Sequence, residues 1–527
     1  MSYNLLREAW LPVVREDGRK DLVAVQDVVG GKSPVVDLSP PRADFRAALM
    51  EFLVGVFQTA MPPDQVSDWR EWLEKPPSPG TIQKRLAPHE PYFNLFGERP
   101  RFMQDLTLSE KEKPARNGAG ALLIDSPGGN TLKQGLDFFV KRGRVENLCP
   151  ACAGAALFTL QAFAPSGGKG HRTSLRGGGP LSTLMDGTTL WEKVWSNVMP
   201  LSCRDAAVPP EANGLPGAVY PWAAKTRTSE KGEEIHPGDV HPLHAYWGMP
   251  RRILLEKSPS EAACDLCGEV SPLAVATYLT RPSGYNYGPT WRHPLTPYRE
   301  YGDDASPLSI KGQANIAAYS HWLGLVYGQP AEQGGKRQGT VIPAACVRFA
   351  RRQLRGRGIN AAGYDMDNMK AVQWCEHAFP AFALNGEETE YREMVGEMVR
   401  AADQVRRNLA GALKDALVNE AGKNQAKIDA TFFANASVLF WSSTESAFFA
   451  QAKALASVED LDAQDGLYQE WGRVLDKAAM DLFDEMAMSG RLPSERLERC
   501  VEARRRMRNY NRKYLKNNEF WPEGGER

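Results

Sequence analysis

The sequence lacks an excess of charge of either sign. Its 527 residues include 64 lysines and arginines and 64 aspartates and glutamates, so that the net charge is zero. A protein that binds nucleic acid on its own usually has a basic excess, because neutralising phosphates supplies much of its affinity. We therefore expect either locally placed basic patches or a protein that binds DNA only as part of an assembly.

Long apolar runs are also missing. No stretch of about 18 consecutive apolar residues is present, which argues against a membrane-spanning helix. The first 20 residues mix polar and apolar side chains and lack the charged-then-apolar pattern of a secretory signal. Eight cysteines in a chain of this length, without such a signal, predict a protein of the reducing cytoplasm.

The common catalytic signatures are absent. The patterns GxxxxGK[ST], GxSxG and HExxH do not occur, and no dinucleotide-binding glycine pattern lies between a predicted strand and a predicted helix. The best candidate for a catalytic metal is the stretch 235–247, which holds His236, Asp239, His241 and His244. Because Pro237 and Pro242 interrupt any helix that would align these side chains, we expect ordinary loop histidines and no enzyme activity.

The chain changes character near residue 373. Before it, apolar spacing predicts a helix over 44–60, and the stretch 93–360 is rich in proline, glycine and short apolar runs. After it come four long amphipathic segments, at about 387–418, 425–455, 466–488 and 493–516. Their short connections predict antiparallel neighbours. The sequence therefore predicts an α+β protein with a large irregular mixed domain at 1–372 and a four-helix bundle at 373–527.

Half of the cysteines form two CxxC pairs, Cys149 with Cys152 and Cys264 with Cys267. Two such pairs supply the four thiolates of a tetrahedral structural zinc site, which has no open position for a substrate. The 111 residues between the pairs imply that a Zn²⁺ ion would tie together distant parts of one domain. Redox chemistry would need a thioredoxin-like setting that the sequence does not show, and unmetallated thiols are the other alternative. The remaining cysteines are predicted to be buried: Cys203, Cys346, Cys375 and Cys500.

Two basic features stand out. The segment 164–180, APSGGKGHRTSLRGGGP, combines six glycines with Lys169, His171, Arg172 and Arg176, so its backbone can approach another surface closely. On composition alone, a mobile solvent loop is the alternative. The second feature is an arginine run that contains no acid, and it is either a solvated helix face or a row of phosphate contacts. Its candidates for contact with a nucleic-acid backbone are Arg348, Arg351, Arg352 and Arg355.

Several of these motifs occur in the order and at the intervals typical of a known family. They are NLLREAWLPV at 4–13, PRFMQDL at 100–106, the first CxxC pair running into GAALF, the glycine-rich segment, and CDLCG followed by WRHP at 291–294. Together they make the chain similar to the large subunit of the type I-E Cascade, an RNA-guided CRISPR surveillance complex. The similarity covers essentially the whole chain, including the predicted bundle.

The resemblance implies a nonenzymatic subunit for antiviral defence. It would read a short PAM from the minor-groove side of double-stranded DNA, while pairing with the CRISPR guide RNA reads the sequence. It would also promote strand opening and R-loop formation and recruit a separate helicase–nuclease. Its partners would be the other Cascade subunits, the guide RNA and the target DNA. Two alternatives remain open, a zinc-stabilised metal-dependent nuclease and a purely structural capping subunit.

The resemblance also assigns the PAM-binding residues. The family's glycine loop corresponds to Gly167, Gly168, Lys169 and Gly170. Its loop that contacts guide RNA and backbone subunits corresponds to about 123–146.

Two further PAM-reading elements carry over with changes. The wedge that opens the first base pair falls on Asn368, where the family has glutamine, and Met369 beside it could act as the apolar wedge instead. The family's lysine finger falls on Pro282, so the adjacent Arg281 becomes the candidate for that role.

Overall fold

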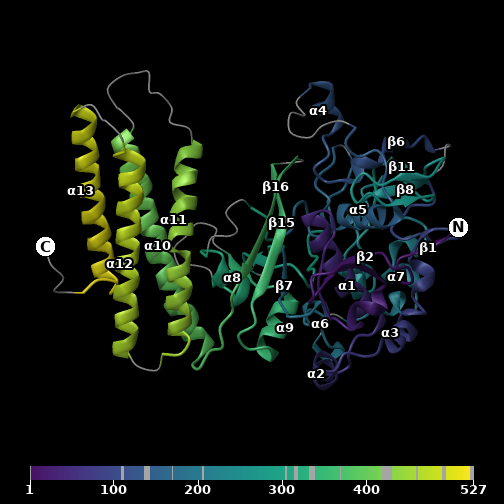
Figure 1. Ribbon diagram of the computed structural model, residues 1–527, viewed down its shortest axis with the longest axis horizontal. Helices are drawn as coiled ribbons and strands as arrows, with labels where there is room; N and C mark the ends of the chain where they lie inside the picture. Colours follow the sequence, from purple (N-terminus) through teal and green to yellow (C-terminus); the bar gives the residue numbers. More distant parts are fainter. Residues whose placement is uncertain are drawn as a thin grey trace. The chain divides into compact units, whose positions relative to one another are not determined.

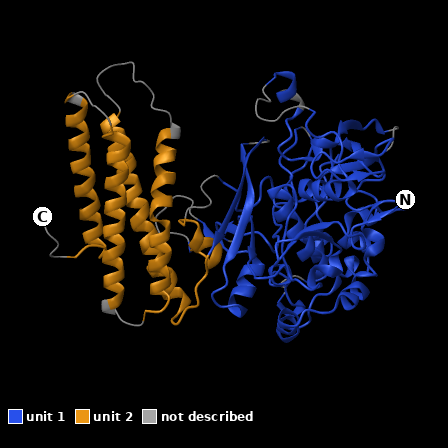
Figure 2. Cartoon of the chain, in the orientation of Figure 1, with its two compact units in different colours: residues 1–314, 330–379 blue, residues 315–329, 380–527 orange. Residues whose placement is uncertain are grey.

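The computed structural model describes residues 2–108, 112–135, 143–168, 170–203, 207–302, 305–313, 319–330, 339–367, 370–417, 430–458, 461–489 and 494–522. The chain forms two compact units (Figure 2): Met1–Ala314 with Pro330–Phe379 make unit 1, and Asn315–Gln329 with Pro380–Arg527 make unit 2. Both helices and strands are present, so the α+β class is confirmed. None of the helices in the described ranges has the length and apolar character needed to cross a bilayer.

The core of unit 1 forms around two apolar helices, α1 (Ala43–Ala60) and α5 (Pro150–Phe163), which contact each other. Both helices are buried over most of their length because their sequences are apolar nearly all round. Phe52 of α1 is at the centre of an aromatic cluster, with edge-on ring contacts at centroid distances of 5.5–6.1 Å. Its partners are Trp10, Phe93, Phe102, Phe158 and Trp247.

Small antiparallel sheets surround this core (Figure 1), each of two or three strands in the described residues. The three-stranded sheets are β3 (Lys20–Val23), β2 (Leu11–Arg15), β4 (Val35–Leu38); β6 (Ala115–Gly118), β11 (Val275–Arg281), β8 (Arg252–Lys257); β13 (Leu308–Ser309), β12 (Tyr298–Glu300), β14 (Thr340–Ile342); and β16 (Lys370–Phe379), β15 (Ile359–Asp367), β7 (Ser182–Met185). The pairs are β1 (Tyr3–Asn4) with β5 (Asn94–Phe96) and β9 (Ala262–Ala263) with β10 (Val270–Ser271). The shorter helices are α2 (Val66–Glu74), α3 (Pro79–Leu86), α4 (Gly129–Lys133), α6 (Leu190–Trp195), α7 (Pro216–Val219) and α9 (Ala345–Gln353).

In the described residues after 379, unit 2 has four long helices close to the predicted positions: α10 (Glu388–Leu417), α11 (Ala430–Leu455), α12 (Leu461–Ala487) and α13 (Ser494–Asn517). In α10, buried apolar residues recur every three or four positions, as at Val395, Met398, Ala402 and Val405. This stripe explains why α10 can contact all three of the other long helices. The same unit includes the short helix α8 (Trp322–Val326).

Part of the core of unit 2 comes from the distant segment that contains α8. Tyr319 is fully buried, stacks on Phe448 at a centroid distance of 4.1 Å and shares a hydrogen bond of 3.0 Å with Thr444. The indole of Trp322 donates to the Pro380 carbonyl at 2.6 Å and is also fully buried. Tyr319 also contacts Trp441 of α11 and Trp471 of α12, and Trp322 contacts Phe448 of α11. All three of these partners follow in the chain by more than a hundred residues.

Candidate metal centre and glycine loop

The four cysteines of the two CxxC pairs meet in unit 1, as the sequence predicts. Their sulfur atoms all lie within 4.8 Å of one another, and those of Cys149 and Cys267 are 3.6 Å apart. Zn–S bonds of about 2.3 Å in a tetrahedron place sulfurs about 3.8 Å apart, so the spacing fits a bound zinc ion. All four are free thiols. Within the described ranges, no other group of three or more such side chains is arranged for a metal.

The first pair is positioned by the start of α5. Cys149 is the N-cap residue of the helix, and its sulfur accepts a hydrogen bond of 3.5 Å from the Cys152 amide. Pro150 occupies the first helical turn, where the missing N–H costs nothing. Two of the candidate metal ligands therefore lie at the start of a helix.

The second pair lies in a tight turn. Gly268 has a φ of +81° and donates its amide to the Cys264 carbonyl at 2.8 Å, a conformation that favours glycine. The carboxylate of Asp265 accepts bonds of 2.7 and 2.8 Å from the amides of Glu146 and Asn147, which lead into Cys149. These contacts hold the two pairs together independently of any metal.

The electrostatics of the four clustered cysteines also favour a bound cation. Hydrogen bonds to the sulfurs of Cys149 and Cys264, together with burial, raise the pKa of the Cys152 thiol well above its ordinary value. Four thiolates this close repel one another unless a divalent ion neutralises them. Four sulfur donors without a carboxylate are the ligand set of structural zinc sites.

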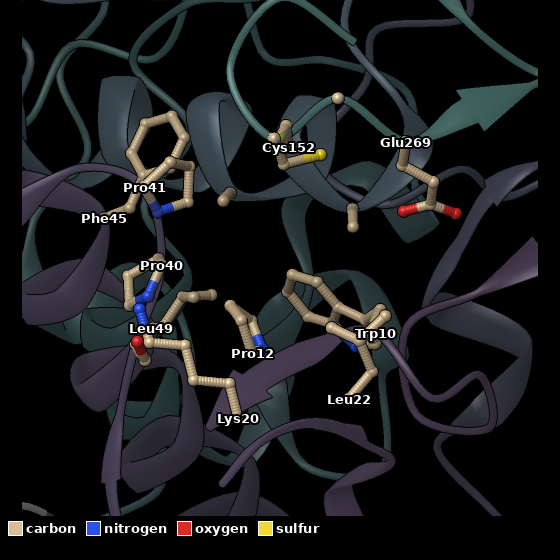
Figure 3. A pocket seen from close by; sticks show the side chains of 15 residues that line it. Trp10, Pro12, Lys20, Leu22, Pro40, Pro41, Phe45, Leu49, Cys152 and Glu269 are labelled. Carbon is tan, nitrogen blue, oxygen red and sulfur yellow. The ribbon is translucent and has the colours of Figure 1, made fainter. Parts of the chain in front are cut away.

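A pocket of 630 Å³ opens beside the cluster (Figure 3). Cys152 and Cys267 form part of its wall, with Trp10 among its apolar residues. Lys20 and Glu269 lie on opposite sides of it (Figure 3). Small molecules can therefore approach two of the four ligand residues from this side.

The glycine loop 167–170 packs against the end of β11. The Gly170 carbonyl accepts a hydrogen bond of 2.7 Å from the Ser283 amide, and a Cβ on Gly170 would lie 2.8 Å from Cβ of Pro282. Gly168 has a φ of +90°, and a Cβ there would have no described atom within 4 Å. One side of the loop is therefore fixed to the protein, while Gly168 faces open space. Lys169 lies outside the described residues.

Arg281 directly precedes Pro282 and Ser283, the two residues that contact Gly170. Its backbone therefore lies near the glycine loop. Its guanidinium pairs with Glu112 and Glu230, each at 3.4 Å, and its side chain is 34% exposed. The two carboxylates already neutralise much of the charge that a DNA contact would use. Both partners are distant in the chain, and nothing in the sequence around Arg281 indicates either of them.

The other end of the glycine-rich segment contacts the β15–β16 hairpin. A Cβ on Gly179 would lie 2.7 Å from the Tyr364 carbonyl oxygen and 2.6 Å from Cγ of Met366. The hairpin's paired residues extend to Asp367 opposite Lys370. The wedge candidates, Asn368 and Met369, follow Asp367 in the chain and lie outside the described residues.

Arg176, one of the cations of this segment, is not available to a ligand. It is buried and forms a two-pronged ion pair with Glu51 of α1, at N–O distances of 2.9 and 3.2 Å. It also bonds to the hydroxyls of Ser182 and Thr296. Its own carbonyl accepts from Lys311 at 2.7 Å. Arg176 therefore fixes the base of the glycine-rich segment to the core.

The arginine run divides into two groups. Arg348, Arg352 and Arg355 are exposed, and no carboxylate lies within 4 Å of them in the part of the chain that the structure describes. Arg351 is half-buried, and Arg357 pairs with Glu192 at 3.2 Å. The exposed three are the stronger candidates for contact with an external anion.

The histidines of 235–247 do not converge. His244 is buried between the Ala218 carbonyl and the Tyr287 hydroxyl, at 3.2 and 3.0 Å. His241 accepts a bond from the Leu243 amide, and His236 lies 3.7 Å from Glu234. This separation gives the metal-dependent nuclease alternative no support.

Of the other cysteines, Cys346, Cys375 and Cys500 are buried as predicted, and the prediction is wrong for Cys203. Cys203 ends a short 3-10 helix, Leu201–Cys203, none of whose residues is buried.

Comparisons with known proteins agree with this architecture. The family model described as CRISPR-associated protein Cse1 matches residues 4–482. Two similar solved structures are Cse1 from Acidimicrobium ferrooxidans (18% identity, TM-score 0.69, 99% of each chain) and Cse1 from Thermobifida fusca (18% identity, TM-score 0.71, 98% of each chain). A chain of a CRISPR RNA-guided surveillance complex is also similar, with 17% identity and a TM-score of 0.65 over 97% of this chain and 99% of that one. At these identities the structures show a shared fold.

Proposed function

The chain belongs to the Cse1 family of CRISPR-associated proteins, and from that premise we propose that it is the large subunit of a type I-E Cascade surveillance complex. In this role it reads the PAM in double-stranded target DNA and begins strand opening. The fold that it shares with a chain of an RNA-guided surveillance complex supports the assignment. Other Cascade subunits and the guide RNA are its partners, and the bound Zn²⁺ is structural.

The glycine loop is the observation that carries PAM reading. Gly168 faces open space on a loop that is held in place through Gly170 and Ser283. A glycine backbone can approach the floor of a narrow minor groove closely because it has no side chains. Since the loop is already fixed to the protein, its binding there costs little conformational entropy. Arg281 takes the role of the lysine finger beside this loop. To do so, its guanidinium exchanges the carboxylates of Glu112 and Glu230 for a contact with DNA.

Strand opening is assigned to the end of the β15–β16 hairpin. Asn368 and Met369 act there as a wedge, because an apolar side chain inserted at a base step unstacks it. The hairpin's contact with Gly179 couples this wedge to the glycine-rich segment. After R-loop formation the protein recruits a separate helicase–nuclease, which cleaves the target.

The remaining assignments concern location and architecture. The protein acts in the cytoplasm. The four long helices at 388–517 form a four-helix bundle that follows the mixed domain, and the predicted boundary at 372/373 falls within strand β16, which belongs to unit 1. The loop at 123–146 contacts the guide RNA and the backbone subunits, and its residues 136–142 lie outside those described.

Gly168→Asp is expected to weaken binding of the assembled complex to a PAM-containing duplex by about 5–150-fold, equivalent to about 1–3 kcal/mol for the loss of one specific interaction. A carboxylate at this position meets both steric and electrostatic resistance in the groove. Binding would be measured by gel shift on duplexes that differ only in the PAM. Gly18→Asp is the matched control, because Gly18 also has a positive φ, +82°, and open space around it.

The same gel shift separates PAM reading from capping. Both glycine variants should bind single-stranded target normally, because guide pairing alone suffices there. A variant with alanine at Asn368 and Met369 should fail on intact duplex and recover on a target whose first protospacer pairs are already melted. Equal losses on single-stranded and duplex targets would instead show that these residues hold the assembly together.

Replacing Arg348, Arg352 and Arg355 with alanine is expected to weaken binding equally for good and poor PAMs, because phosphate contacts do not specify sequence. The slope of log K against log salt should fall by about 0.9 for each phosphate that is no longer neutralised. Titrations at several salt concentrations measure this. Arg400, Arg473 and Arg505, which are exposed and paired with acids, provide a triple control with the same change in charge. An unchanged slope would mean that the run is only a solvated face.

A further inference from the structure

Arg251 is a buried arginine whose hydrogen-bonding capacity is only partly used. Arg251 directly precedes β8 in the chain and is 8% exposed. Nη2 donates to the Pro165 carbonyl, while buried Nε has no hydrogen-bond partner among the described residues. Two bonds of 2.9 Å between its backbone and the Gln161 side chain fix its position. The guanidinium is therefore held in place with unused donors.

The acids that pair with Arg252 and Arg281 form no ion pair with Arg251 among the described residues. Asp105 pairs with Arg252 at 2.6 Å, and Glu112 and Glu230 pair with Arg252 and Arg281. No ion pair involves Arg251 in the described residues. Burial lowers its pKa to about 10, which still leaves the group charged at neutral pH.

This charge lies directly beneath the glycine loop. A Cβ on Gly167 would be 2.1 Å from Nη1 of Arg251, so only glycine lets the guanidinium approach the loop backbone. His171 is half-buried, and this partial burial together with the charge of Arg251 lowers its pKa. The segment 164–180 contains no acid that could neutralise the guanidinium. Burying a cation without a counter-ion costs free energy, and an anionic group of a bound ligand would offset that cost.

We propose that Arg251 is the cationic floor of a phosphate-binding site at the glycine loop, which takes one phosphodiester of the target DNA duplex. This rests on the proposed function, since it places the duplex at Gly167–Gly170. A planar guanidinium offers two parallel N–H donors to a phosphate, a geometry that lysine cannot reproduce. Arg251 would then anchor the backbone while the loop reads the adjacent groove.

The arrangement predicts opposite effects on folding and on binding. Arg251→Met removes an unpaired buried charge, so the melting temperature of the free protein should stay the same or rise. The same variant, in the assembled complex, should bind duplex target more weakly and show a salt slope lower by about 0.9. Arg251→Lys keeps the charge without the fork and should keep the slope while losing part of the affinity. Arg19→Met, an exposed arginine paired with Asp17, controls for charge and should change neither.

The outcomes of these measurements separate the phosphate site from its alternatives and from the proposed function. A lower melting temperature with equal losses on duplex and single-stranded targets would make Arg251 a structural brace for Pro165. A loss confined to guide RNA binding, measured without target, would assign the phosphate to the guide. If wild type discriminates between PAMs but Arg251→Met keeps the full salt slope, the phosphate site is wrong and the PAM assignment stands. If the slope falls although wild type ignores the PAM, the phosphate site stands and the proposed function fails.

Discussion

A variant with serine at both Cys152 and Cys264 is expected to lose its metal and to unfold at a much lower temperature. The change removes one ligand from each CxxC pair, which leaves too few thiolates to hold the ion. Binding to structural zinc sites contributes about 10–16 kcal/mol in isolated zinc-finger peptides. Unit 1 has its own core and backbone pairing around the site, so we expect a loss on the order of several kcal/mol.

Metal analysis and thermal unfolding measure this effect. Protein purified without chelator should contain one zinc per chain, and the double variant none. Because Cys152 and Cys267 line an open pocket, a small chelator should reach the wild-type site and reproduce the loss of stability. Cys203→Ser is the matched control, since Cys203 is exposed and outside the cluster. Wild-type protein without metal, or equal melting temperatures for all forms, would contradict a structural zinc site.

Glu51→Leu is expected to lower the free energy of unfolding by about 3–5 kcal/mol, the usual cost of leaving one charge of a buried pair without its partner. The side chains of Arg176 and Glu51 are only 2% and 3% exposed, so water cannot replace the lost carboxylate. The loss should be read from denaturant unfolding curves, with binding of duplex target as a second measurement because Arg176 fixes the base of the glycine-rich segment.

A double variant provides the control for this pair. Glu51→Leu combined with Arg176→Met removes both charges and fills similar volume, so most of the stability should return. Additive losses from the two changes would show that Glu51 and Arg176 contribute separately, through packing alone. Recovery of stability without recovery of duplex binding would assign Arg176 a role in positioning the loop.

The parts of the fold with a local signature could be predicted from the sequence. A CxxC pair needs only a helix start or a tight turn to aim two sulfurs at one point, and two such pairs complete the ligand set of one zinc ion. The structure confirms the predicted meeting of the four cysteines, Cys149, Cys152, Cys264 and Cys267. The long helices after residue 379 were equally predictable, because their apolar spacing is set by the helix itself.

Contacts between distant residues that belong to no recognisable motif could not be predicted. Arg176 lies in a stretch that reads as a basic loop, yet its partner Glu51 is 125 residues away and carries no signal of the pairing. Arg251 and Arg252 are adjacent and identical in type, and only the fold gives carboxylates to one of them. Cys203 shows the same limit, since exposure depends on neighbours that local sequence does not reveal.

The segment with Tyr319 and Trp322 has a consequence for synthesis on the ribosome. Tyr319 leaves the ribosome 152 residues ahead of Trp471, one of the rings that it contacts in the finished core. At about 5–20 residues per second, the segment waits roughly 7–30 s for its partners, with two large aromatic side chains exposed. This segment belongs to unit 2 and cannot complete its packing when unit 1 folds. The nascent chain therefore exposes a hydrophobic segment that chaperones can bind. A fragment that begins at residue 380 would have the reverse defect, because its helices would surround a core from which both rings are missing.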